Sequence, residues 1–172
     1  MSDYEWDDND LPLAYLITIR TFGSWLHGDQ RESVDRHGRN VFGSERIKLD
    51  PMLSTKMSRN IAGEEFLLNG QQRPFVEKAI REVCRIRGYQ LAAINVRTNH
   101  AHAVVSAGVR PESIINAFKA NATRELRERG VASRDVKIWS RGGSRKYLWK
   151  PQNVDAAIDY VLYGQGGNLP NF

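Results

Sequence analysis

Apolar and polar residues alternate or recur in patterns that predict several strands. The stretch 13–22 (LAYLITIRTF) is rich in residues that favour strands and predicts a first, central strand. Residues 89–96 (YQLAAINV) and 100–108 (HAHAVVSAG) predict two more strands, and the short polar turn between them (RTN) indicates a hairpin. Residues 136–150 (VKIWSRGGSRKYLWK) predict a second hairpin that reverses at its two glycines.

Apolar residues at helical spacing predict three helices. The first covers residues 73–87 and ends at Gly88, since glycine readily terminates a helix. The second covers 111–129, with Pro111 near its start, and the third covers 153–162. Residues 23–71 carry no clear periodicity and predict loops with one or two short helices; an insertion of this length is often functional.

The order of these elements predicts an α+β fold. Strand, insertion, helix, strand, strand, helix, hairpin and helix follow the ferredoxin-like (split βαβ) layout, an antiparallel sheet with helices on one face. The long insertion comes directly after the first strand. We expect an acidic N-terminal tail over 1–11, a single folded domain over 12–166 and a C-terminal tail over 167–172.

Charge is spread unevenly along the 172 residues. The net charge is +5, but residues 1–10 carry five acidic and no basic side chains, so the rest of the chain carries +10. A basic body favours a polyanionic partner. Cys84 is the only cysteine, which excludes an internal disulfide and fits a reducing compartment, and no apolar run is long enough to span a membrane. We therefore expect a cytoplasmic protein with no membrane partner.

Two histidines stand one residue apart in the stretch 99–105 (NHAHAVV). On a strand, His100 and His102 point to the same face, and imidazole is a common ligand of divalent metals. A pair of hydrogen-bonded histidines on a half-buried strand is the alternative, and the spacing alone leaves both open.

The last predicted helix carries two tyrosines. Its apolar face gathers Val154, Ala157, Ile158, Val161 and Leu162. Tyr160 lies away from that face, either as a functional side chain or as a half-exposed tyrosine that shields the helix flank. Tyr163 is a second candidate on the solvent side.

With NHAHAVV, the basic helix after it and AIDYVLYGQGG, the chain resembles the single-tyrosine HUH transposases, which include bacterial REP-associated tyrosine transposases. The resemblance runs over residues 13–166. It implies that His100 and His102 hold a divalent cation, Mg²⁺ or Mn²⁺, and that Tyr160 attacks a phosphodiester of single-stranded DNA. A 5′-phosphotyrosine bond and a free 3′-OH would result. A phenol needs a base or a cation to become a good nucleophile at neutral pH, which agrees with this assignment.

The chain departs from the family at one position. Members often carry a polar third metal ligand four residues after the tyrosine, where this chain has Gly164. Gln165 follows, but in an ideal helix it would point about 140° away from Tyr160. A helix break at the surrounding glycines would let Gln165 reach the metal, so we name it as the candidate third ligand. Otherwise water and DNA must complete the coordination.

Single-stranded DNA is bound by cationic grooves with aromatic platforms. The candidate DNA-binding residues are Arg97, Lys119, Arg124, Arg127, Arg141, Arg145 and Lys146. We interpret Trp149 as a core residue that anchors the sheet. The resemblance implies hairpin-containing DNA as the partner and a protein associated with the bacterial nucleoid, and it leaves monomer and homodimer open.

Two other functions fit the same sequence. One is a domesticated nucleic-acid-binding module of the same fold that has lost its chemistry. The other is a metal-dependent phosphoesterase that uses water instead of Tyr160. An enzyme with a tyrosine nucleophile would form a covalent adduct with DNA, which neither alternative would form.

Overall fold

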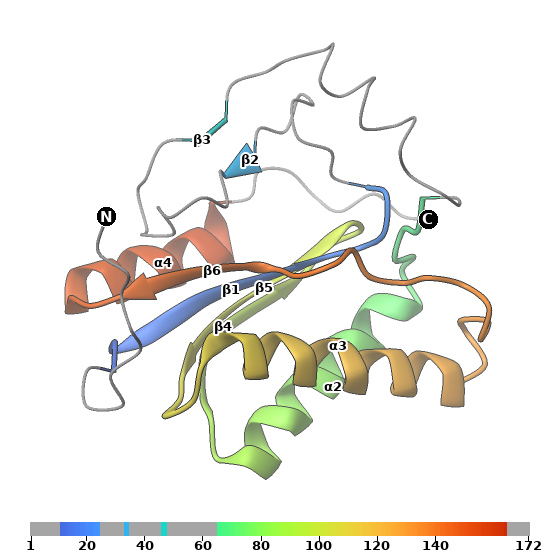
Figure 1. Cartoon of the computed structure of the whole chain (residues 1–172), viewed down its shortest axis with the longest axis horizontal. Coiled ribbons are helices and arrows are strands. Elements are labelled where there is room, and N and C mark those ends of the chain that lie inside the picture. Colours follow the sequence, from blue (N-terminus) through green and yellow to red (C-terminus); the bar gives the residue numbers. More distant parts are fainter. Residues whose placement is uncertain (1–10, 25–32, 35–45, 48–64, 165–172) are drawn as a thin grey trace.

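Four antiparallel strands form the central sheet of a computed structural model, which describes residues 11–24, 33–34, 46–47 and 65–164 (Figure 1). The elements are β1 (Ala14–Arg20), β2 (Ser33–Val34), β3 (Arg46–Ile47), α2 (Gln72–Arg87), β4 (Gln90–Val96), β5 (His100–Ser106), α3 (Pro111–Glu128), β6 (Ser144–Leu148) and α4 (Pro151–Tyr163). The strand order is β4-β5-β1-β6. Since α2 connects β1 to β4 and α3 connects β5 to β6, the ferredoxin-like α+β fold is confirmed.

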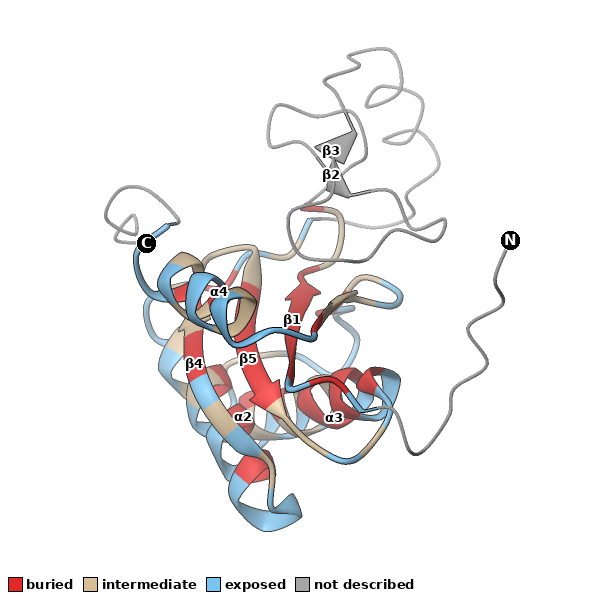
Figure 2. Ribbon diagram, turned by 90° about the vertical axis from the view of Figure 1, so that its left-hand side faces the viewer, coloured by how far each residue is buried: buried red, intermediate tan, exposed pale blue. Residues whose placement is uncertain are grey.

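Helices cover both faces of this sheet, whereas the sequence predicted helices on one face. Helices α2 and α3 lie on one side and α4 on the other (Figure 1). The α2–α3 side holds the larger core, to which β1 contributes Tyr15 and Ile17. On the α4 side, Leu16 packs with Val161 in a second, smaller cluster. Strand β1 is buried at every residue (Figure 2) because its apolar side chains point alternately to both faces, so each face needs a cover.

The second predicted hairpin is wrong. Residues 138–140 and β6 both run along β1 in the same direction: Thr21 bridges to Trp139, and Thr18 pairs with Ser144. The glycines at 142 and 143 form a bulge between these two stretches and do not reverse the chain. Gly143 fits there because an added Cβ would lie 2.9 Å from the Thr18 carbonyl oxygen.

The other predicted elements are confirmed with small shifts in their ends. Gly88 terminates α2 with a left-handed φ of 69°. Within the 23–71 insertion, β2 and β3 pair as a short antiparallel ladder, Ser33 with Ile47, where the sequence predicted loops and short helices. In the part of the chain that the structure describes, no helix is long and apolar enough to cross a membrane.

Candidate active site

A row of polar side chains crosses the α4 face of the sheet at the level of His102. Strand pairing places His102 opposite both Thr18 of β1 and Asn95 of β4. Thr18 in turn pairs with Ser144 of β6. Residues directly opposite each other point to the same face. The row therefore borders the apolar cluster beneath α4, and His100 lies one step further from that cluster.

Both histidines use the same ring nitrogen in short hydrogen bonds to uncharged oxygens. The Nδ1 atom of His102 lies 2.6 Å from the Thr18 hydroxyl, and Nδ1 of His100 lies 2.6 Å from the Asn99 side-chain oxygen. The two ring centroids are 4.5 Å apart. His102 is only 4% exposed, so its ring orientation is fixed by packing as well as by the hydrogen bond.

Tyr160 packs directly against His102. The ring centroids are 5.5 Å apart with an angle of 60° between the planes. Tyr160 is half-buried beside the smaller cluster, whereas Tyr163 is 80% exposed. The structure therefore brings together His100, His102 and Tyr160, and it leaves Tyr163 outside this group.

The position four residues after Tyr160 has room for little more than a hydrogen atom. A Cβ added at Gly164 would lie 3.0 Å from the Tyr160 ring atom Cδ2. Gln165, the candidate third ligand, lies outside the described residues. Within the described ranges, no group of three or more His, Cys, Asp or Glu side chains could hold a metal ion.

The donor set fits a divalent cation in part. Histidines that bind metals usually direct their other ring nitrogen to an oxygen atom, and both Nδ1 atoms here contact oxygens. A cation would then be bound through Nε2 of each imidazole. The described residues supply two protein ligands, fewer than a divalent cation requires, so Gln165 or oxygen atoms from DNA and water would have to complete its shell.

Arg20 is a site residue that the sequence analysis missed. It pairs with His100 across β1 and β5, so it shares the face of the histidines, and its exposure is 9%. Arg20 is two residues from Thr18, and side chains at that spacing on a strand point to the same face, so the sequence could have placed these two together. The pairing of β1 with β5 was needed to place Arg20 beside a histidine.

The predicted DNA-binding residues divide between the two faces of the sheet. Lys146 pairs with Leu16 and therefore lies on the face of the histidines. Arg97 is in the turn between β4 and β5, where its backbone N–H donates to the backbone carbonyl of His100, and Arg141 is exposed in the bulge. Arg145 points to the α3 side, where it forms an ion pair with Glu112 at 2.7 Å.

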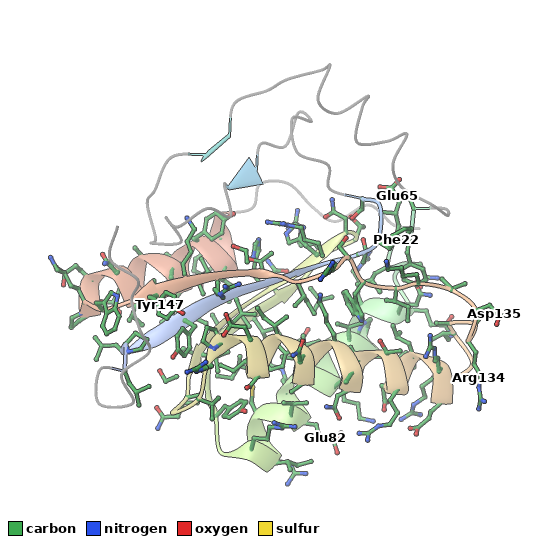
Figure 3. The ribbon with its side chains drawn as sticks, in the orientation of Figure 1. Phe22, Glu65, Glu82, Arg134, Asp135 and Tyr147 are labelled. Atoms are coloured by element: carbon green, nitrogen blue, oxygen red, sulfur yellow. The ribbon has the colours of Figure 1, made fainter. Side chains whose placement is uncertain are left out.

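The three candidates on α3 contact their own surroundings. Lys119 donates to the backbone carbonyls of Ser140 and Gly142, which fastens the bulge. Arg127 donates to the carbonyl of Arg134 at 3.1 Å, in a loop that Figure 3 shows at the opposite end of the molecule from Tyr147. Arg124 donates to Asn121. All three residues belong to α3, which covers the face of the sheet away from α4 and the histidines (Figure 1).

Two further interpretations from sequence have clear outcomes. Cys84 is a core residue, as predicted, and burial raises the pKa of its thiol to about 11, so it is protonated at neutral pH. Trp149 is not a core residue: it is 39% exposed and stacks on Tyr147, with 6.2 Å between ring centroids.

The ferredoxin-like sheet carries His100 and His102 on β5, and Tyr160 on α4 packs against His102. The family model described as "Transposase IS200 like" matches residues 52–152, more than half of the chain. The chain belongs to this family of transposases. The match includes both histidines, and Tyr160 lies just beyond it.

The fold is also similar to that of solved structures. The solved structure of a REP-associated tyrosine transposase bound to a REP hairpin is similar, with a TM-score of 0.47 and 15% sequence identity. The similarity covers 94% of this chain and 70% of that one. No curated protein matches the sequence significantly.

Proposed function

We propose that this protein cuts and rejoins single-stranded DNA through a covalent bond to Tyr160, with a divalent cation held by His100 and His102. The observation that carries the proposal is the packing of the Tyr160 ring against His102 within one chain. Membership of the IS200-like transposase family supports a role in DNA transposition or a related rearrangement.

In the proposed reaction, the Tyr160 oxygen attacks the scissile phosphorus in line with the leaving oxygen. A bond forms between phosphorus and the tyrosine oxygen, and the bond from phosphorus to the 3′ oxygen breaks. The phenol gives up its proton, and the departing 3′ oxygen takes one up as a hydroxyl. Attack by the 3′-OH of another strand reverses these steps and releases Tyr160, so rejoining needs no ATP.

A bound Mg²⁺ or Mn²⁺ would neutralise charge on the scissile phosphate and orient it. The protein's own part is to hold the two imidazoles and to fix the tyrosine beside them. The Thr18 and Asn99 oxygens orient the imidazoles, and α4 packs Tyr160 against the second one. Lys146, Arg97 and Arg141 are the predicted cations best placed to bind the DNA backbone on this side of the sheet.

Adduct trapping tests the proposal. The protein is mixed with labelled single-stranded hairpin oligonucleotides and Mn²⁺, denatured in detergent and separated by size. We expect a shifted band whose linked peptide, identified by mass spectrometry, carries DNA on Tyr160. Tyr160→Phe, His102→Ala and a chelator should each abolish the band, while Tyr163→Phe, a matched control on the same helix, should leave it intact.

Other outcomes would contradict parts of the proposal. An adduct on Tyr163 would keep the reaction class and move the nucleophile. Cleavage without an adduct would favour a phosphoesterase that uses water. Tight DNA binding with neither adduct nor cleavage, across a broad pool of oligonucleotides, would indicate an inactive binding module.

A further inference from the structure

Asn95 lies where strand β4 meets both the histidine strand and the tyrosine helix. It is the strand partner of His102 on β5. Its side-chain amide Nδ2 donates a hydrogen bond of 3.0 Å to the backbone carbonyl of Val161 on α4. The half-buried side chain of Asn95 therefore links the strand position beside His102 to Val161, the residue that follows Tyr160.

The carbonyl that Asn95 binds lies in the last turn of α4. The last four carbonyls of an α-helix lack intrahelical donors and must be satisfied by other groups. The Tyr160 carbonyl accepts from the Gly164 N–H at 3.0 Å, and the Val161 carbonyl accepts from Asn95. The turn that carries Tyr160 is thus held at two successive carbonyls, the second of them by the sheet.

The apolar cluster beneath α4 has far fewer buried residues than the core on the other face of the sheet. It joins Ala157 and Val161 of the helix to buried side chains of the sheet, which are Ala14, Leu16, Ala93, Val104 and Leu148. A small cluster buries little area, and because contact energy scales with buried area, it holds a helix less firmly than a large core does. A directional hydrogen bond at this contact restricts a shift of the helix more specifically than the apolar contacts do.

We propose that Asn95 is a positioning residue that fixes the tyrosine helix in register with His102. This inference rests on the proposed function of Tyr160 as nucleophile. Loss of the amide donor frees the C-terminal turn of α4, and the Tyr160 ring no longer keeps its 5.5 Å spacing from His102. Small misplacements of reacting groups are costly to rate, so adduct formation slows while DNA binding is retained.

The test compares Asn95→Ala and the near-isosteric Asn95→Asp with Gln72→Ala. Gln72 is a matched control because its side-chain amide also donates to a backbone carbonyl, that of Val131 at 2.7 Å, away from α4. Hydrogen exchange reports on the last turn of α4. Single-turnover adduct formation reports on the rate, and filter binding of the oligonucleotide without metal reports on affinity.

We expect amides near Tyr163 and Gly164 to exchange at least tenfold faster in both Asn95 variants. The adduct rate should fall on the order of 100-fold, with an oligonucleotide Kd within about twofold of the wild type. Gln72→Ala should lower the overall stability but leave the exchange of the last turn of α4, the adduct rate and the oligonucleotide Kd close to the wild-type values. If Asn95→Asp fails to fold, Asn95→Ala decides.

Unchanged hydrogen exchange in the last turn of α4 of a folded Asn95 variant would overturn the inference. An equal loss of oligonucleotide affinity and adduct rate would also overturn it, because Asn95 would then be a DNA contact. The exchange measurement needs no activity. A wild type without adduct would therefore reject the proposed function, while the exchange data still decide whether Asn95 holds the helix.

Discussion

At the scale of single residues, the neighbours of the histidines matter as much as the histidines. Thr18 is 5% exposed and its hydroxyl contacts Nδ1 of His102 at 2.6 Å. A hydroxyl can accept a hydrogen bond from Nδ1–H, which leaves the lone pair on Nε2 for a cation. In the proposed site, this tautomer would direct Nε2 of His102 to the metal, and Thr18 would act as the residue that orients the ring.

Replacing Thr18 with valine keeps the shape and removes the hydroxyl. We expect Thr18→Val to weaken Mn²⁺ binding about 10- to 100-fold, as other losses of a hydrogen bond behind a ligand do, and Thr18→Ser to retain most of it. Titration followed by electron paramagnetic resonance measures the affinity. Equal Mn²⁺ affinities for Thr18→Val and the wild type, with unchanged imidazole nitrogen shifts of His102 in the metal-free protein, would remove this role from Thr18.

At the scale of elements, the last strand is shaped by its bulge. Residues 138–140 and β6 follow β1 on either side of Arg141–Gly143, and Lys119 of α3 fastens the bulge through two backbone carbonyls. The bulge lets β6 continue beside Thr18, which brings Ser144 into the polar row and Lys146 onto the histidine face. The chain then enters α4 directly.

Gly143→Ala tests how tightly that bulge is packed. The added methyl would lie 2.9 Å from the Thr18 carbonyl oxygen and 3.1 Å from Ile115 Cδ1, so we expect a loss of about 1–3 kcal/mol in the free energy of unfolding. Gly108→Ala is the matched control, since its nearest atom would be 3.9 Å away. That variant should stay within about 0.5 kcal/mol of the wild type in urea denaturation. Similar midpoints for the two variants would show that the bulge yields easily.

At the scale of the whole molecule, one chain carries both halves of the proposed site. His102 on β5 and Tyr160 on α4 are in ring contact within the same chain, and Asn95 ties the two elements together. A chain arranged in this way does not need a second copy to supply its tyrosine.

Mixing two inactive variants distinguishes a site within one chain from a site shared between copies. Tyr160→Phe lacks the nucleophile and His102→Ala lacks a ligand, so a shared site would regain activity when the two are combined. We expect no adduct from the mixture above the sum of the separate proteins. Recovery to a quarter or more of the wild-type yield, after joint unfolding and refolding to exchange any subunits, would mean that the tyrosine helix serves a partner.

Most of the fold could be predicted because local signals agreed with the final structure. The strand-forming stretch before residue 22, the helix that Gly88 ends and the hairpin that carries both histidines each follow from residues close in sequence. The Gly-Gly hairpin was wrong because two glycines permit either a turn or a bulge. Long-range pairing decided between them: Thr18 of β1 pairs with Ser144, and the N–H of Phe22, just after β1, donates to the Ile138 carbonyl.

The sequence by itself determined which candidate functional groups the protein has. They are two histidines on one face of a strand, a tyrosine away from the apolar side of a helix, and a net positive charge after the acidic first ten residues. Those depend on periodicity and residue type, which act locally. Only the tertiary structure decided which groups meet. Strand pairing, a long-range property, set His102 between Thr18 and Asn95, put Arg20 beside His100 and sent Arg145 to the other face. The packing of α4 on the face opposite α2 and α3 then placed Tyr160 against His102 and left Tyr163 in solvent, because the helix buries its apolar side on the sheet.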